Sequence, residues 1–208
     1  MFKTSDVQNI MEETEYELFN IPWEDILPKQ EFIKNKSWKA RLYIDEDIEN
    51  LLNLFLDATE LYKNSELYGC IFEKNSIKNI KIVKVEKSLN ELYSLLFEYG
   101  DNMSFIDHCL ITNETMDFFF VKESEREIFY IFGEDKFIKK IMPIKFESYK
   151  LLFKTTMNEY ILSNEKYKAR KMKQFWEVFI APYLKLELTQ PLTIVTLNEN
   201  ETIDYSYD

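Results

Sequence analysis

The single histidine and the two cysteines are the residues of this chain that could act as nucleophiles or zinc ligands. His108 directly precedes Cys109, and Cys70 stands 39 positions before Cys109. Neighbours in a strand point to opposite faces, so His108 and Cys109 do not make a nucleophile–base pair in the strand predicted there. Zinc sites use ligands paired at short spacing, which these three residues lack. We expect a structural His108, two thiols that behave as small buried hydrophobic groups, and no metal site.

A second set, one aspartate and a Glu-x-Lys motif, could support metal-dependent hydrolysis. Asp117 opens a predicted strand, and Glu134-Asp135-Lys136 follows the next one. The set resembles the core of the PD-(D/E)xK nucleases, in which carboxylates hold a metal ion and the lysine assists water. Met116 stands where that family has a proline before the aspartate. The other interpretation is structural, because Glu134 and Asp135 begin a predicted helix, where carboxylates stabilise the positive end of the helix dipole.

Nucleotide-binding loops are a third possibility, and the glycine content argues against them. The chain has only three glycines, Gly69, Gly100 and Gly133, in separate segments. The Walker loop and the dinucleotide-binding fingerprint both need closely spaced glycines that let the backbone wrap around phosphate. We therefore expect no nucleotide loop and no cofactor.

The charge pattern indicates what kind of partner the chain attracts. The net charge is −11, yet Lys136–Lys173 holds eleven Lys or Arg against three Glu, so the remaining residues carry −19. Acidic residues concentrate in a first predicted helix, in a helix from Asp45 to Glu60, and in the tail after Lys185. A field of this sign repels nucleic-acid phosphates and anionic membranes and favours a basic protein partner. The alternative is a solvated acidic surface that only keeps the protein in solution.

The candidate partner-binding residues are carboxylates of the two acidic helices. Such side chains can mimic nucleic-acid phosphates or occupy a basic active site. The basic run at 166–173 could contact RNA or a membrane, but the aromatic residues after it are typical of a core helix. In that interpretation the basic run is a solvated face or an internal counter-charge to the acidic helices. The candidate set comprises Glu12, Glu13, Glu17, Asp45, Glu46, Asp47, Glu49, Asp57 and Glu60.

Three apolar runs rich in aromatic and β-branched residues predict the centre of the fold. They are the strands Phe105–Thr112, Met116–Lys122 and Glu127–Phe132, joined by polar breaks short enough for hairpins. A helix from Glu134 to Met142 follows them. Consecutive aromatic residues at 118–120 must fall on both faces of their strand, which is typical of a sheet covered on both sides.

Elements on either side of this centre complete a mixed order of helices and strands. The order indicates an α+β fold, with a central antiparallel or mixed sheet packed by several helices. We expect a single domain over residues 1–208, with a polar, acidic tail at 198–208 that frays. The further expected elements are a helix from the capping box Ser5–Gln8, the strand Lys39–Ile44, the helix from Asp45, the hairpin of Leu67–Glu73 and Asn79–Glu86, a helix from the capping box Ser88–Glu91 to Gly100, helices over 146–162 and 164–181, and strands Leu184–Leu188 and Leu192–Leu197.

Targeting and membrane segments are not expected. No apolar run reaches the roughly 18 residues of a membrane span. The start of the chain, MFKTSDVQNI, turns polar without the apolar region of a signal peptide. These features predict a cytoplasmic protein with reduced thiols and no membrane partner.

In general character the chain resembles bacterial toxin-immunity proteins, which are small, acidic, poor in glycine and without catalytic motifs. The stretch Ile111–Asn113 with Met116–Val121, followed by Ile131–Gly133 and Glu134–Ile141, is similar to the strand–hairpin–helix unit of several of them. The resemblance covers about 30 residues and transfers no specific binding residue. It implies non-enzymatic, one-to-one inhibition of a basic toxin domain, with electrostatic steering of association. The alternatives are a phage-type inhibitor of a nucleic-acid-handling defence complex, the metal-dependent nuclease, and a structural subunit of an assembly.

Overall fold

The fold is taken from a computed structural model of the chain. The structure describes residues 29–43, 47–73, 76–98, 106–123, 128–143, 192–197 and 203–207. The predicted N-terminal helix, the helices over 146–162 and 164–181, and the strand over 184–188 lie outside these residues. Contacts divide the chain into two compact units, Met1–Pro143 and Ile144–Asp208. A single domain over the whole chain stays a prediction.

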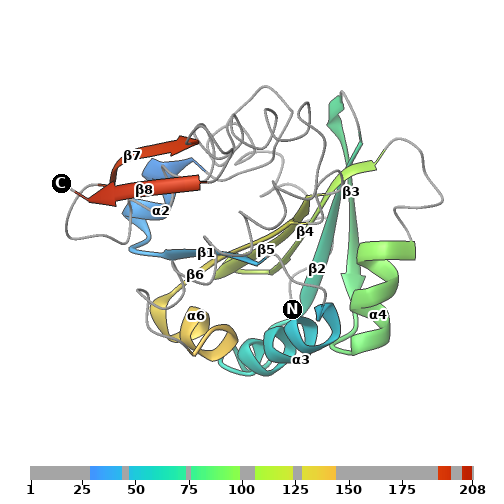
Figure 1. Cartoon of the computed structure of the whole chain (residues 1–208). Coiled ribbons are helices and arrows are strands. Elements are labelled where there is room, and N and C mark those ends of the chain that lie inside the picture. Colours follow the sequence, from blue (N-terminus) through green and yellow to red (C-terminus); the bar gives the residue numbers. More distant parts are fainter. Residues whose placement is uncertain are drawn as a thin grey trace. The chain divides into compact units, whose positions relative to one another are not determined.

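The described part of the first unit is built on a six-stranded antiparallel sheet with helices packed on it (Figure 1). The strand order is β1-β6-β5-β4-β2-β3. This arrangement confirms the predicted α+β fold and shows that the sheet is antiparallel. Along the chain the elements are α2 (Gln30–Asn35), β1 (Lys39–Tyr43), α3 (Ile48–Thr59), β2 (Leu67–Glu73), β3 (Ser76–Val85), α4 (Leu89–Tyr93), the π-helical turn η1 (Ser94–Glu98), β4 (Ile106–Asn113), β5 (Phe118–Glu123), β6 (Ile128–Gly133) and α6 (Asp135–Ile141).

The three central strands and the helix after them form where the sequence predicts them, within two residues at each end. Other boundaries need correction. The second acidic helix begins at Ile48. The Asp47 carboxylate caps it there by accepting a hydrogen bond from the main-chain N–H of Asn50 at 3.2 Å. β3 begins at Ser76, ahead of the predicted Asn79, and a register shift at Phe72/Glu73 accommodates the extra residues. The short helix α2 was not predicted, since six residues show too little of a helical period.

The second unit is described over one antiparallel hairpin, β7 (Leu192–Leu197) and β8 (Ile203–Tyr207). β7 forms as predicted. β8 lies within the acidic segment 198–208 and pairs along β7. Its run Ile-Asp-Tyr-Ser-Tyr alternates apolar and polar residues with the period of a strand, a pattern too short to stand out in an acidic segment.

Aromatic side chains cover both faces of the sheet, as the sequence predicts. Phe118, Phe119 and Phe120 of β5 are all 0% exposed. Phe118 and Phe120 contact Phe55 of α3, with ring centres 5.6 and 4.6 Å apart. Phe119 points to the opposite face, where its ring centre lies 5.4 Å from that of Trp38. Burying one Phe side chain contributes about 1.5–3 kcal/mol, so this strand is a main source of core stability.

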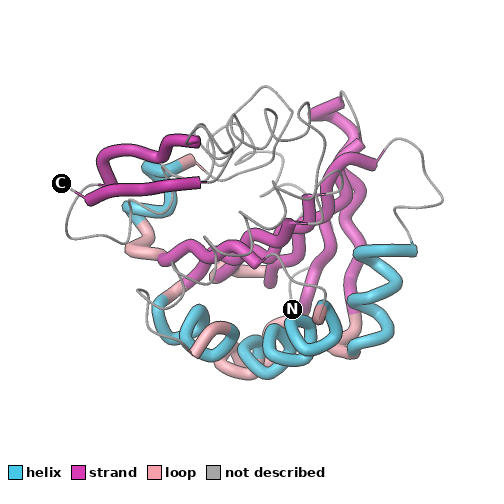
Figure 2. Tube along the Cα trace, viewed as in Figure 1, coloured by secondary structure: helices cyan, strands magenta, loops and turns pink. Residues whose placement is uncertain are grey.

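Among the described elements, α6, α3 and α4 lie side by side on the face of the sheet that carries Phe118 (Figure 2). The central one, α3, packs against both α6 and α4. Glycines let the helical side chains approach the strands: a Cβ atom at Gly133 would lie 2.8 Å from Cδ1 of Phe137, and one at Gly69 would lie 2.5 Å from Cδ2 of Leu95. These close contacts hold α6 and η1 on the sheet. α3 packs against α6 and α4, and its outer side carries part of the candidate site.

Candidate partner-binding surface

Four of the predicted partner-binding carboxylates lie on α3 or directly at its ends, and all four are exposed. They are Asp47, Glu49, Asp57 and Glu60. The other predicted carboxylates, Glu12, Glu13, Glu17, Asp45 and Glu46, lie outside the described residues. The described part of the candidate set therefore belongs to the second acidic helix, α3.

The amphipathic character of α3 fixes the direction of its carboxylates. Leu51 and Phe55 on one side of the helix are 0% exposed. Glu49, Asp57 and Glu60 are eight and three residues apart, spacings that return each to nearly the same side of a helix with about 3.6 residues per turn. Because the buried stripe lies opposite them, these three carboxylates form one acidic face directed to solvent.

Lysines of α6 lie beside the C-terminal end of this acidic face. The ammonium group of Lys140 donates to the main-chain carbonyl of Asp57 at 2.8 Å. Lys139 forms an ion pair with Asp135 of its own helix at 2.5 Å. The carboxylates at this end of α3 therefore have cationic neighbours, which offset part of their field.

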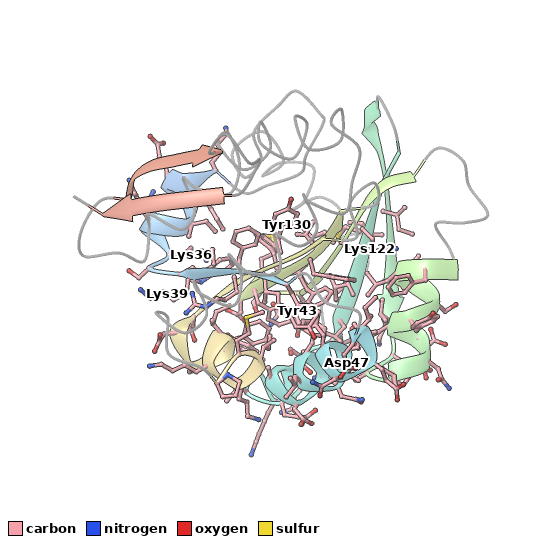
Figure 3. The ribbon with its side chains drawn as sticks, in the orientation of Figure 1. Lys36, Lys39, Tyr43, Asp47, Lys122 and Tyr130 are labelled. Atoms are coloured by element: carbon pink, nitrogen blue, oxygen red, sulfur yellow. The ribbon has the colours of Figure 1, made fainter. Side chains whose placement is uncertain are left out.

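Four aromatic residues form a row that starts beside the N-terminal end of α3 and continues to α4. The hydroxyl of Tyr43 donates to the carbonyl of Asp47 at 3.2 Å, and Figure 3 shows Tyr43 on the sheet near the start of the helix. Tyr43 stands opposite Phe129 in the β1–β6 register. The Phe129 ring centre lies 6.3 Å from that of Phe97, which in turn stacks on Tyr93 at 4.7 Å. The row ends at the surface, because Tyr93 is 48% exposed.

The nuclease-like residues meet at one end of the sheet. Phe118 and Gly133 are register partners of β5 and β6. Asp117 and Glu134 are their immediate neighbours in the chain, so the two carboxylates are brought to the same end of these strands. Glu134 forms an ion pair with Lys136 at 2.7 Å, an exposed contact of the ordinary kind at the start of a helix.

Asp117 has a structural role in the turn between β4 and β5. Its carboxylate accepts from the amide group of Asn113 at 2.8 Å and from the hydroxyl of Thr115. Met116 before it has φ 49°, whereas a proline ring holds φ near −65°. The proline of the nuclease motif therefore does not fit this turn. Among the described residues, no group of three His, Cys, Asp or Glu is placed to hold a metal ion.

Tyr62, which follows α3, is a residue near this end of the sheet that the sequence does not single out. Its ring centre lies 5.4 Å from the ammonium nitrogen of Lys136. Burial, and then the charges of Glu134 and Asp117, raise the pKa of the phenol above its usual value. The phenol therefore stays protonated at neutral pH. Its neighbours come from distant segments, so no sequence pattern could have indicated this contact.

The two thiols are buried and lie on opposite faces of the sheet. Cys70 pairs in register with Leu110, whereas Cys109 pairs with Ile71, so adjacent strands direct the two sulfur atoms to different sides. Both are free, as expected for buried hydrophobic groups. Burial raises the pKa of both thiols, that of Cys109 to about 12. Thiols that stay protonated do not act as nucleophiles at neutral pH.

Comparison with known proteins gives no relative of this chain. No protein family, no curated protein and no solved structure matches it. In the described ranges, no helix combines the length and the apolar character needed to cross a membrane. A function has to be argued from the surface itself.

Proposed function

We propose that this chain is a cytoplasmic, non-catalytic binding protein that neutralises a basic partner in the manner of a toxin-immunity protein. The observation that carries the proposal is the outward face of α3. Glu49, Asp57 and Glu60 are exposed there, while the opposite stripe of the same helix is fully buried. Because the core fixes this helix, the carboxylates are presented in a constant pattern to any protein that approaches.

The physical role of such a face is to guide association. Complementary charge raises association rates and excludes like-charged partners, whereas it adds less to affinity itself. The residues that could support hydrolysis have structural contacts, Asp117 in its turn and Glu134 with Lys136. These contacts support assigning them to stability, in keeping with a protein that acts by binding.

The test is capture of a partner on the immobilised full-length chain, followed by an activity assay. We expect a basic protein that leaves with rising salt and whose toxic activity is lost when the chain is added. The variant Glu49→Gln/Asp57→Asn/Glu60→Gln should slow association on the order of tenfold at low salt. Asn53→Gln, on the same exposed face, is the matched control and should leave the rate unchanged.

Other results of this test would contradict the proposal or favour a different function. If the captured protein keeps its activity in the presence of the chain, or if the neutralised variant associates at the wild-type rate, the proposal fails. If the partner instead loses its ability to bind nucleic acid, the phage-type inhibitor becomes the better description. Metal-dependent cleavage of nucleic acid by the purified chain, abolished in Asp117→Ala and Lys136→Ala, would favour the nuclease.

A further inference from the structure

A basic corner lies where α2 leads into β1. Residues 29–41 carry five lysine or arginine residues and one glutamate, a local charge of +4 in a chain whose net charge is −11. Within this segment Lys34 and Lys36 are exposed, and Lys39 is half-buried. We propose that these three lysines, which define the basic corner, bind a short acidic segment of another protein.

The turn at the end of α2 fixes where the lysines lie. Ser37 has φ 54°, the left-handed conformation that commonly ends a helix. Its N–H donates to the Lys34 carbonyl at 2.9 Å, and the N–H of Trp38 donates to the Ile33 carbonyl at 3.0 Å. This pair of hydrogen bonds is a Schellman motif. The chain therefore passes from α2 into β1 through one well-defined turn, with all three lysines within a few positions of it.

Aromatic packing orders Lys36 at this turn. The rings of Phe32 and Trp38 meet edge to face with their centres 5.4 Å apart, and both contact the buried Phe119 of β5. The ammonium nitrogen of Lys36 lies 5.8 Å from the centre of the Phe32 ring and 5.9 Å from that of Trp38. Figure 3 shows Lys36 and Lys39 near the start of β1. A side chain that is already ordered loses less conformational entropy when a partner binds it.

In the described part of the chain, no carboxylate forms an ion pair with Lys34 or Lys36. Lys84, Lys136 and Lys139, by contrast, each pair with a glutamate or an aspartate. The C-terminal end of a helix carries about half a negative charge, which offsets only part of the charge of two ammonium groups. The basic corner therefore keeps a surplus of positive charge at the surface, and that surplus favours an anionic group.

A short acidic protein segment fits the basic corner better than a nucleic acid does. Trp38 is only 5% exposed, so it offers no open ring face on which a base could stack. A nucleic acid also carries a charge at every phosphate, and beyond the corner it would meet the negative field of a chain with net charge −11. A second copy of the chain brings the same unfavourable net charge. A few carboxylates on another protein match the ammonium groups without this penalty.

The basic corner is separate from the acidic face of α3. Phe32 of α2 stacks on Phe119, whereas Phe55 of α3 contacts Phe118, and these two neighbours in β5 point to opposite faces of the sheet. The inference therefore goes beyond the proposed function and does not depend on it.

The test is an NMR titration of the isotope-labelled full-length chain with acetylated hexaglutamate at low salt. The amide signals of residues 34–39 should shift. Lys34→Gln/Lys36→Gln should weaken binding on the order of tenfold, because one exposed ion pair contributes about two- to fivefold. Lys34→Arg/Lys36→Arg keeps both charges and should stay within about twofold of wild type. Thermal melts of each variant verify that the fold is intact.

A matched control removes two exposed lysines from other parts of the described chain. Lys63→Gln/Lys87→Gln changes the net charge by the same amount as Lys34→Gln/Lys36→Gln. It should bind hexaglutamate within about twofold of wild type. An equal loss in both variants would mean that the net charge controls binding, and the inference would fail.

Three further results would overturn the inference. The first is hexaglutamate that leaves the amides of residues 34–39 unshifted or binds Lys34→Gln/Lys36→Gln as tightly as wild type. The second is tighter binding of inorganic phosphate or of a thymidine hexanucleotide at the same amides, which would assign the basic corner to phosphate groups. The third is a shift of these amides with protein concentration alone, which would identify the occupant as a second copy of the chain.

Discussion

The ammonium nitrogen of Lys122 lies 3.9 Å from the centre of the Phe97 ring, so a charged side chain from the inner face of the sheet covers an aromatic ring of η1. Lysine is rarely directed towards a core unless its charge has partners. Here the same ammonium group donates to the Leu96 carbonyl at 2.8 Å, one of the carbonyls that a helical end leaves without an internal donor. Lys122 therefore ties β5 to the π-helical turn.

Replacing Lys122 by methionine should lower the free energy of unfolding by about 1–3 kcal/mol. The change removes a cation–π contact and leaves a carbonyl without its donor, while it keeps the length of the side chain. Urea denaturation monitored by tryptophan fluorescence measures the difference. Lys87→Met, at an exposed position before α4, is the control and should have little effect. Equal stability of the Lys122 variant and the wild type would show that the contact contributes nothing.

Much of this fold follows from short-range pattern, and the rest depends on pairing between distant segments. The apolar runs of β4, β5 and β6 are bounded by short polar breaks in the sequence, so the sequence predicts these strands well. The outward direction of Glu49, Asp57 and Glu60 likewise follows from the helical period of α3. The difference between the two ends of that helix does not, because it arises from contacts with α6 and α4. The row from Tyr43 to Tyr93 joins residues that no local pattern connects.

Gly133→Ala should destabilise the protein more than Gly69→Ala. A Cβ atom at Gly133 would lie 2.8 Å from the ring of Phe137 and 3.3 Å from Cβ of Phe118, two groups with little room to move. The cost should be about 1–3 kcal/mol, as for other overpacked cores. At Gly69 the new atom would meet only the flexible end of Leu95, which can rotate. Thermal melts of the two variants give the order, and the reverse order would contradict this packing.

The carboxylate of Glu66 should make stability depend on pH in the acidic range. It pairs with Lys84 and accepts from the Tyr68 hydroxyl at 2.8 Å, and these hydrogen bonds hold its pKa below the usual 4.5. A pKa lowered by folding contributes stability above the unfolded value, and that contribution is lost as the pH falls through the folded value. Glu66→Gln should therefore be less stable than wild type at pH 7.

The difference in the free energy of unfolding between Glu66→Gln and wild type should shrink as the pH falls below 4.5 and through the pKa that Glu66 has in the folded protein. Urea denaturation at a series of pH values measures it. Glu86→Gln, at an exposed loop position, serves as the control and should show no such trend. A difference that stays constant with pH would mean that the carboxylate of Glu66 is not held by its partners.

Cys70 and Cys109 should react with thiol reagents only when the protein unfolds. Both are buried, and burial raises their pKa, so few thiolates are present at pH 8. Alkylation of the native protein by iodoacetamide should be at least about 100-fold slower than at an exposed thiol. The variant Asn53→Cys supplies such a thiol on the outer side of α3. Rapid labelling of Cys70 or Cys109 in the folded protein would contradict their burial.

Met116 offers a test of the turn that holds Asp117. Its φ of 49° lies in the left-handed region, which costs an ordinary residue about 1–2 kcal/mol, whereas glycine loses about 0.5–1 kcal/mol of entropy on folding. Met116→Gly should therefore raise the free energy of unfolding by about 0.5–1 kcal/mol. Met116→Pro should lower it by more than about 2 kcal/mol, because φ cannot be reached and the Met116 amide loses its bond to the Asn113 carbonyl.

The two Met116 variants also separate the structural role of Asp117 from the nuclease alternative. The proline variant restores the residue that the nuclease motif has before its aspartate, yet it breaks the turn that holds the Asp117 carboxylate. Urea denaturation should give the order glycine, wild type, proline from most to least stable. A proline variant as stable as wild type would mean that the turn adopts a different backbone conformation and that the fit to the nuclease motif has to be reconsidered.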